Sequence, residues 1–283
     1  MGEADPVNLK SIIVNGYEMT YLDQGEGIPV IWIHGSLGDC RSWENQTEFF
    51  SKKYRTLVLN LRPGSSEFGN ESPVSIGHHA EDLSGFIKTL DMGPVHLVGH
   101  SRGGAVVLKM MTVHPDLFHS AVLADPAPFA QLFSDDSEGM EEIERRNRIV
   151  GKALDLIQKG DLDKGLELFT DSVSRMGAWK KFSEAARQIR RENAGSLKSL
   201  IRDVQEPLNC ENLKKIKNPV LLITGENSPR IYGRMHETLR GCLRNFQWAV
   251  IGNASHGMHR DNPETFNGFV IDFLNKNSPK QGR

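Results

Sequence analysis

The sequence has few cysteines and no long hydrophobic segment. Its 283 residues include three cysteines, Cys40, Cys210 and Cys242, which lie far apart and form no CxxC pair. This spacing predicts neither a disulfide framework nor a thiolate zinc site. The apolar runs reach only about five to six residues, whereas a membrane span needs about 18. Because the N-terminus also lacks the apolar core of a signal peptide, we expect a cytoplasmic protein with no membrane span.

An excess of charge of one sign is also missing. The 34 Lys and Arg residues nearly balance the 36 Asp and Glu residues, for a net charge of −2. Binding to a nucleic-acid backbone needs a basic surface, so we expect no nucleic-acid partner. Metal-ligand spacings such as HExxH do not occur in the sequence, and we therefore predict no metal site.

The composition that remains is that of an ordinary globular protein. Hydrophobic residues make up 38% and charged residues 25% of the chain, which excludes disorder as the main state. At about 150 residues per domain the length suggests two domains, although a single open α/β sheet can absorb this length.

Short β-rich runs alternate with helical patterns along the chain. Most of these runs do not alternate polar and apolar residues, which is typical of strands buried on both faces of a parallel sheet. We therefore predict an α/β fold with a mostly parallel, doubly wound sheet. The expected strands are 11–14, 17–22, 29–34, 55–61, 95–99, 120–125, 219–224 and 247–251, and the expected helices of the core are 76–91, 103–113 and one from Pro263.

One long stretch interrupts this alternation. Between about Ala127 and Lys217 the pattern is helical, with helices expected at 143–159, 162–173, 181–190 and 194–204. We predict that 127–217 is a helical lid inserted into an α/β core made of 1–126 and 218–283. The chain then has a discontinuous core and one insertion rather than two independent domains.

A nucleophile motif lies between a strand and a helix. The segment Gly99-His100-Ser101-Arg102-Gly103 matches the pattern G-x-S-x-G, which is weak evidence on its own. Here an apolar run ends at Gly99 and an apolar helical stretch begins just after Ser101. This strand–turn–helix context predicts a nucleophile elbow with Ser101 at its apex, next to a helix N-terminus that favours negative charge.

Four motifs in this order resemble a known family. They are YLDQGEGIPVIWIHGSLGD (21–39), GHSRGG (99–104), LADPAP (123–128) and GNASHGMHRDNPETF (252–266). From about Tyr21 to Leu274 the chain resembles lid-bearing α/β-hydrolases of the carboxylesterase and C–C hydrolase type. The resemblance implies an α/β-hydrolase fold and catalysis by a serine, a histidine and an acid.

The resemblance also implies an oxyanion hole. In such hydrolases the residue after His-Gly donates a backbone N–H, which here is Ser36, with Leu37 as an alternative. The second donor is the N–H of the residue after the nucleophile, Arg102. Two aimed donors stabilise the negative oxygen of the tetrahedral intermediate.

The base is expected in the segment after the last strand. A serine hydroxyl is a weak nucleophile until a base takes its proton, and an imidazole suits this task. Of the ten histidines, His256 has the expected position after both the nucleophile and the last strand. His259 is its nearest rival, while His34 and His100 are expected to be structural.

The acid departs from the common pattern. The resemblance places it three residues after Gly225, where this chain has Ser228, and a serine cannot supply a carboxylate. Related hydrolases with a displaced acid carry it at the end of the strand that here ends at Asp125. We favour Asp125, with Glu226 as the alternative; Asp261 is expected to cap the last helix instead.

The pocket is expected to be partly apolar. We predict that Phe129, Trp179 and Met258 contact the substrate. Other aromatic or sulfur-containing side chains of the lid that are able to line the pocket are Phe133, Phe169, Met176 and Phe182.

These observations predict a cofactor-independent serine hydrolase, similar to the carboxylesterases, that cleaves a small or medium, partly apolar carboxylic ester. The alternatives with the same triad are a C–C bond hydrolase, a lactonase and a thioesterase. A non-catalytic binding protein on a hydrolase fold is the alternative from another class, supported by the missing usual acid. The serine nucleophile and the absence of tyrosine from the lid disfavour epoxide hydrolases. We expect a monomer or a homodimer.

Overall fold

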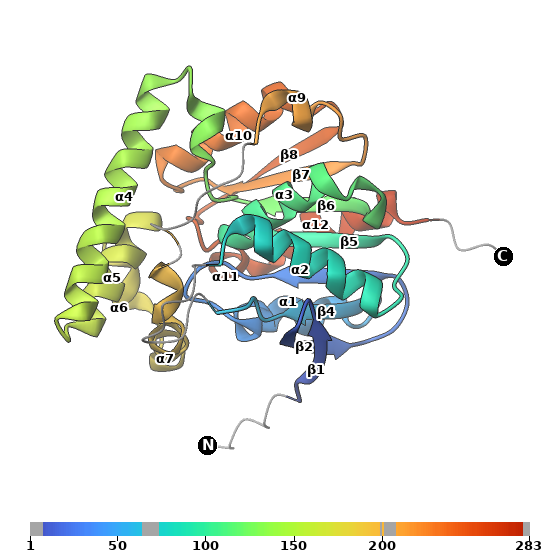
Figure 1. Cartoon of the computed structure of the whole chain (residues 1–283), viewed down its shortest axis with the longest axis horizontal. Helices are drawn as coiled ribbons and strands as arrows, with labels where there is room; N and C mark the ends of the chain where they lie inside the picture. The colour runs from blue at the N-terminus through green and yellow to red at the C-terminus, as the bar shows by residue number, and fades with distance from the viewer. Residues whose placement is uncertain (1–7, 64–73, 199, 201–207, 280–283) are drawn as a thin grey trace.

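Eight β-strands form one twisted sheet in the computed structural model, which describes residues 8–63, 74–198, 200 and 208–279 (Figure 1). The spatial order is β1-β2-β4-β3-β5-β6-β7-β8, with β1, β2 and β4 paired antiparallel and all other neighbours parallel. The strands are β1 (Lys10–Val14), β2 (Tyr17–Gln24), β3 (Pro29–Ile33), β4 (Arg55–Leu59), β5 (Val95–His100), β6 (Phe118–Ala124), β7 (Val220–Gly225) and β8 (Phe246–Ile251). The prediction of a mostly parallel, doubly wound sheet is confirmed, because helices cover both of its faces.

Each face of the sheet has its own hydrophobic core. On one face, α2 (Ile76–Thr89), α3 (Arg102–Val113) and α10 (Arg230–Cys242) pack against strand residues such as Ile31. On the other face, α1 (Glu44–Phe50) and α12 (Pro263–Asn277) pack against strand residues such as Trp32. Every residue of β5 is buried, so the continuous apolar runs in the sequence indeed reflect burial on both sides of the sheet.

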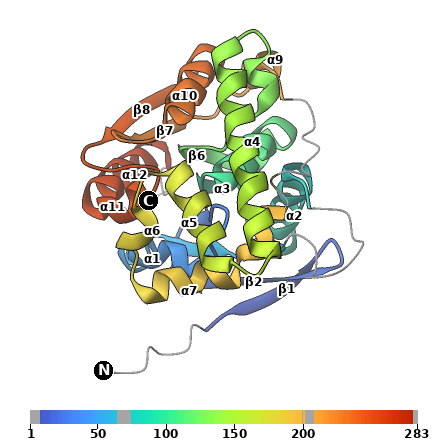
Figure 2. The ribbon, with the colours of Figure 1, turned by 90° about the vertical axis from the view of Figure 1, so that its left-hand side faces the viewer.

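The chain between β6 and β7 is helical and lies beyond one end of the sheet (Figures 1 and 2). Its elements are η3 (Ala130–Phe133), α4 (Ser137–Gln158), α5 (Leu162–Val173), α6 (Ala178–Lys181), α7 (Glu184–Glu192), η4 (Ala194–Leu197) and α9 (Cys210–Leu213). We call residues 130–213 the helical insertion. The expected helix 194–204 is described only at its start, as most of its remainder lies outside the described residues.

The helical insertion has a small core that includes one residue of the α/β part. Val150, Leu166, Phe169 and Trp179 from the insertion pack around Leu37, which follows β3. The insertion therefore rests on the loop after β3, at the end of the sheet where parallel strands place ligand sites.

Two helices in the α/β part were not expected from the sequence. These are α1 and α10, and short helical turns add η1 (Cys40–Trp43), η2 (Pro115–Leu117) and α11 (Met258–Asp261). Within the described residues, no helix is long and apolar enough to cross a membrane.

The cysteine expectation is wrong. Cys210 at the start of α9 and Cys242 at the end of α10 form a disulfide, with 32 residues of sequence separation. Their spacing gives no local signal, because only the folded chain brings the two helices together. Cys40 is a buried free thiol.

Candidate active site

Ser101 occupies a strained turn between β5 and α3. Its backbone has φ 53° and ψ −118°, a region that residues with a side chain rarely adopt. The turn is tight because α3 begins against β3: a Cβ added to Gly103 would lie 2.3 Å from the carbonyl oxygen of Ile33. The predicted strand–turn–helix around Ser101 is thus present, and its sharpness requires glycine at position 103.

The loop after β3 lies directly beside Ser101. A Cβ added to Gly35 would be 3.0 Å from the Cβ of Ser101, and Ser36 and Leu37 line the same cavity as Ser101. The N–H of Leu37 donates to the Ser196 hydroxyl at 3.0 Å, so this amide is already engaged by the helical insertion. Of the two N–H groups expected for the oxyanion hole in this loop, only that of Leu37 is engaged in this way, and we therefore keep Ser36 as the expected donor.

His256 and Asp125 form a buried hydrogen-bonded pair. The Nδ1–H of His256 donates to Oδ2 of Asp125 at 3.3 Å, and Asp125 is completely buried. Asp125 follows β6 with φ 41°, a second strained backbone position at this end of the sheet. Since Nδ1 of the imidazole faces the carboxylate, Nε2 is left for a proton acceptor role.

Aromatic rings hold the imidazole of His256 from two sides. The Tyr232 ring stacks on it with centroids 4.1 Å apart and planes at 14°, and the His100 ring lies 4.5 Å away. The Nε2–H of His100 also donates to the carbonyl oxygen of His256 at 2.7 Å. His100 immediately precedes Ser101, so this contact ties the histidine loop to the serine turn.

Two further side chains hold Asp125 in place. Ser228 donates its hydroxyl to Oδ2 at 2.6 Å, and Nε2–H of His236 donates to Oδ1 at 3.2 Å. Burial alone would raise the pKa of Asp125, but the hydrogen bonds from His236 and His256 outweigh it and hold the pKa below its usual range. Ser228 occupies the position of the usual acid, and here it serves the displaced carboxylate.

The other candidate acids and the other candidate base have different partners. Glu226 accepts a hydrogen bond from the N–H of Asn253 at 2.8 Å, and Asp261 accepts one from the N–H of Ser255 at 2.9 Å. Burial lowers the pKa of His259 well below its usual value. Among the described residues, Asp125 is the carboxylate that contacts His256.

Ser101 and His256 open into one cavity of about 340 Å³, near the lower end of the usual range for small-molecule sites. The helical insertion supplies part of its wall through Phe169, Val173 and Phe182. The cavity therefore lies between the strand ends and the insertion. Within the described ranges, no group of three or more His, Cys, Asp or Glu residues is placed to hold a metal ion.

The three residues expected to contact substrate lie elsewhere. Phe129 packs in the core around α3, Trp179 in the core of the helical insertion, and Met258 in the core on the opposite face of the sheet. None of them is among the described residues that line the cavity with Ser101. Their side chains are needed for packing, whereas Phe169 and Phe182 do line it and Met176 is largely exposed.

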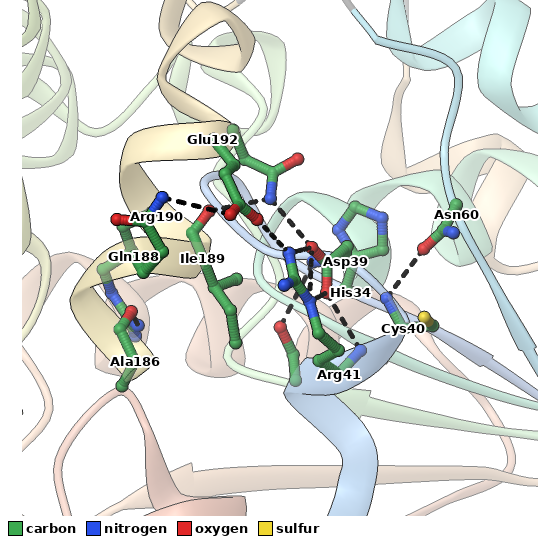
Figure 3. Close-up of polar contacts among 12 residues, drawn as sticks. His34, Asp39, Cys40, Arg41, Asn60, Ala186, Gln188, Ile189, Arg190 and Glu192 are labelled. Carbon is green, nitrogen blue, oxygen red and sulfur yellow. Dashed lines mark hydrogen bonds and ion pairs between the residues drawn. The ribbon is translucent and has the colours of Figure 1, made fainter. Parts of the chain in front are cut away.

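Polar contacts join the loop after β3 to the helical insertion (Figure 3). The Arg41 guanidinium bonds Asp39 and Glu192, both at 2.5 Å, and the Asn193 amide donates to Asp39 at 2.9 Å. Glu192 ends α7, so this network fixes one side of the insertion next to the cavity.

A family comparison agrees with this geometry. The family model described as alpha/beta hydrolase fold matches residues 28–263, which include the serine turn, Asp125 and His256. The chain belongs to the alpha/beta hydrolase fold family.

Known members of the family similar to this chain differ in their named activities. A putative esterase/lipase of Haemophilus influenzae is 26% identical, covering 92% of this chain and 88% of its own length. Epoxide hydrolase 2 of Caenorhabditis elegans is 25% identical, covering 96% and 81%. An esterase from Exiguobacterium antarcticum superposes with a TM-score of 0.74 at 21% identity, covering 94% of this chain and 98% of that one. The last similarity shows the fold alone.

Sequence reasoning missed Tyr232 and His236, which both come from α10. They are one helical turn apart, so both face the His256–Asp125 pair. Burial, the larger effect, raises the pKa of Tyr232, while Arg146 and a hydrogen bond with Ser101 lower it. The apolar spacing of Ile231, Met235 and Leu239 carried a helical signal, but nothing in it shows what the helix packs against.

Proposed function

We propose that this alpha/beta hydrolase is a serine hydrolase that cleaves a carboxylic ester through an acyl-enzyme. The observation that carries the proposal is that Ser101, at a strained turn, lines one cavity with His256, whose imidazole is hydrogen-bonded to the buried Asp125. Two neighbours that the serine and the imidazole share support this pairing. Tyr232 stacks on His256 and hydrogen-bonds with Ser101, and His100 contacts His256 and directly precedes Ser101 in the chain.

In the first half of the reaction, Ser101 Oγ forms a bond to the ester carbonyl carbon. Nε2 of His256 takes the hydroxyl proton, and the ionised Asp125 stabilises the resulting imidazolium. The N–H groups of Ser36 and Arg102 bind the negative oxygen of the tetrahedral intermediate. The ester C–O bond then breaks, and His256 gives its proton to the leaving alcohol.

In the second half, water attacks the acyl carbon. His256 removes a proton from this water, a second tetrahedral intermediate forms, and the bond to Ser101 Oγ breaks. The proton returns to Oγ, and the carboxylic acid leaves. Asp125 is suited to both halves, because its lowered pKa keeps it ionised near neutral pH.

We further propose that the helical insertion, within a lid of residues 127–217, closes the site. Phe169, Val173 and Phe182 form an apolar wall over the strand ends, which limits water around the charged intermediate and strengthens the stabilising dipoles. Leu37 and Asp39 anchor the lid to the loop that also carries Ser36. The rest of the chain, 1–126 and 218–283, forms the catalytic core.

The serine is what favours acyl transfer over other chemistry of the family. Epoxide hydrolases are among the similar proteins, but an aspartate nucleophile is typical of that chemistry, and the apex residue here is Ser101. Lactones, thioesters and vinylogous diketones are cleaved by the same serine chemistry, so these three substrate classes form the other arms of the test.

The test measures hydrolysis of 4-nitrophenyl esters of graded acyl length, beside lactones, thioesters and a vinylogous diketone. We expect the esters to give the highest kcat/KM. Ser101→Ala should reduce kcat by about 10⁴–10⁶-fold, because the covalent route is lost. If the wild type hydrolyses none of these substrates, or Ser101→Ala retains full activity, the proposal is wrong. If a lactone, a thioester or the diketone gives a higher kcat/KM than the esters, that class is the substrate instead of a carboxylic ester.

A further inference from the structure

Two arginines lie in the wall of the cavity that holds Ser101. Arg190 comes from α7 of the helical insertion and is only 8% exposed. Arg260 comes from α11, four residues after His256. Both line the cavity together with Ser101 and His256, so one small molecule in this space can reach the serine and the guanidinium groups.

Among the described residues, neither arginine forms an ion pair with a carboxylate, although the charge of the adjacent Asp261 acts on Arg260. Nη1 of Arg190 donates to the carbonyl oxygen of Ala186 at 2.6 Å, and its guanidinium lies 3.8 Å from the Phe182 ring. The Arg260 guanidinium lies 5.6 Å from that same ring. The nearby Asp261 already accepts a hydrogen bond from the N–H of Ser255. Both cations thus lie near the Phe182 ring, and neither has a hydrogen-bonded carboxylate partner.

The next residue on α7 shows what a paired arginine looks like in this protein. Arg191 bonds Asp163 at 2.7 and 2.8 Å and Glu184 at 2.5 Å. Arg191, which does not line the cavity, is therefore paired with carboxylates, whereas Arg190, which lines it, is not.

The charged side chains of the cavity wall are mostly cations. The charged side chains among its described lining residues are four cations, Arg175, Lys181, Arg190 and Arg260, and a single carboxylate, Asp261. Burial and the neighbouring Arg260 lower the pKa of Arg190 to about 9. Burial also lowers the pKa of Arg260, and it outweighs the opposite effect of the Asp261 carboxylate. A lowered pKa means that the folded chain holds these charges at a cost, which a bound anion would relieve.

We propose that Arg190 and Arg260 form an anion subsite that binds a free carboxylate on the substrate. The planar guanidinium fork matches a carboxylate and favours bidentate hydrogen bonds to it. This inference rests on the proposed serine-hydrolase function and names its substrate class, an ester whose acyl or alcohol part carries a carboxylate. The carboxylate binds at the arginines while the ester carbonyl lies at Ser101.

The test compares two substrates of equal acyl length, 4-nitrophenyl hemiadipate with its carboxylate and neutral 4-nitrophenyl hexanoate. We expect the wild type to favour the hemiadipate by at least about 10-fold in kcat/KM. Arg190→Gln and Arg260→Gln should each lower kcat/KM for the hemiadipate by about 10–100-fold, the effect of losing a charge-assisted hydrogen bond. For the hexanoate the change should stay within about 3-fold. Arg191→Gln, the matched control on α7, should keep the preference.

Thermal unfolding separates a binding role from a structural one. Because burial lowers the pKa of both arginines and neither forms an ion pair, their replacement by Gln should leave the Tm unchanged or raise it. Monomethyl adipate should raise the Tm of the wild type and of Arg191→Gln, but not of the two cavity variants, and dimethyl adipate should have no effect. An equal loss of both ester activities with a lowered Tm would overturn the inference, as would an absent wild-type preference.

The same measurements distinguish a failure of the proposed serine-hydrolase function from a failure of the proposed anion subsite. If the wild type hydrolyses neither these two esters nor any substrate of the first test, the proposed function fails. The Tm shift with monomethyl adipate then still tests the anion subsite. If inorganic phosphate raises the wild-type Tm and monomethyl adipate does not, the subsite binds phosphate and the carboxylate assignment is wrong.

Discussion

Asp125 and Ser228 together replace the acid that is usually found at the position of Ser228. Asp125 contacts His256, and Ser228 donates a hydrogen bond to Asp125. Its carboxylate accepts hydrogen bonds from Ser228, His236 and His256, which come from three separate parts of the chain. Because Asp125 is fully buried, its hydrogen bonds act in a low local dielectric and stabilise the carboxylate more than they would at the surface. The acid is therefore held by its surroundings although it lies on another strand than is usual.

This arrangement predicts unequal effects of removing the two candidate carboxylates. Asp125→Asn should lower kcat by about 10³–10⁴-fold, because the imidazolium loses its charged partner and His256 loses its fixed tautomer. Glu226→Gln, the matched control, should stay within about 3-fold, since Glu226 contacts the backbone of Asn253 instead. Steady-state kinetics on the preferred ester checks this, and a larger loss for Glu226→Gln would reverse the assignment.

The same carboxylate gives a pH-dependent contribution to stability. Its pKa in the folded protein lies below the usual 3.8, so ionised Asp125 stabilises the fold fully above about pH 4. This stabilisation is lost as the pH falls towards the lower folded pKa. The Tm difference between wild type and Asp125→Asn should therefore narrow from pH 7 to pH 3; a constant or growing difference would contradict it.

At this scale the sequence predicted what short motifs encode. The prediction of Ser101 rests on a local pattern, that of Ser36 and Arg102 on the family resemblance, and that of His256 on its place in the chain order. The choice between Asp125 and Glu226 stayed open because it depends on which side chain reaches His256 in space. Tyr232, His236 and Arg190 carry no motif, because their relation to the site arises only from the packing of α10 and α7.

Among the elements, the junction of β5 and α3 depends on close backbone approach. The helix begins against the end of β3, where Gly103 leaves no room for a side chain. Such a position is predictable from G-x-S-x-G, since the pattern encodes this steric requirement. The strands were also predictable from local sequence. A strand that is buried on both faces of the sheet consists of a continuous run of apolar residues.

Two glycines on helices give a matched test of this junction. Gly103→Ala should destabilise the fold by about 1–3 kcal/mol or more, because its Cβ would overlap the Ile33 carbonyl oxygen. Gly151→Ala in α4 meets nothing within 4 Å and should stabilise by about 0.5–1 kcal/mol. Urea unfolding measures both, and equal effects of the two changes would contradict the steric account.

Other elements were missed for physical reasons. The segment of α10 contains Gly233 and Gly241, and these weak helix formers lower the helical signal of its sequence. We predicted that Phe129, Trp179 and Met258 contact the substrate because the pocket was expected to be partly apolar. Size and position in the sequence do not tell a packing residue from a lining residue, and the three belong to three different hydrophobic cores.

Over the whole molecule, one sheet supports one site with a helical insertion above its strand ends. The length alone suggested two domains, whereas the insertion shares Leu37 with the loop after β3 and forms part of the cavity wall. Net charge was a poor guide to the site. Its value is near zero for the whole chain, whereas four of the five Asp, Glu, Lys or Arg side chains that line the cavity are cations. Only the distribution of charge in the folded chain shows this.

The disulfide between Cys210 and Cys242 gives a prediction for the whole chain. It closes a loop of 32 residues, and the chain-entropy model assigns to such a loop about 3–4 kcal/mol of stability. Reduction before urea unfolding should lower the free energy of unfolding by this order. Thiol counting under denaturing conditions should give one free thiol, Cys40, in the oxidised protein and three after reduction; three without reductant would show that the bond does not form.

The central claim is that Ser101 is an activated nucleophile, and covalent labelling tests it most directly. A fluorophosphonate reacts with the serine of a working serine, histidine and acid triad and leaves an adduct of known mass. We predict one adduct per chain, mapped by peptide mass spectrometry to Ser101, strongly slowed in Asp125→Asn and absent in Ser101→Ala. Native protein that takes up no adduct, or a Ser101→Ala variant labelled like the wild type, would contradict the account.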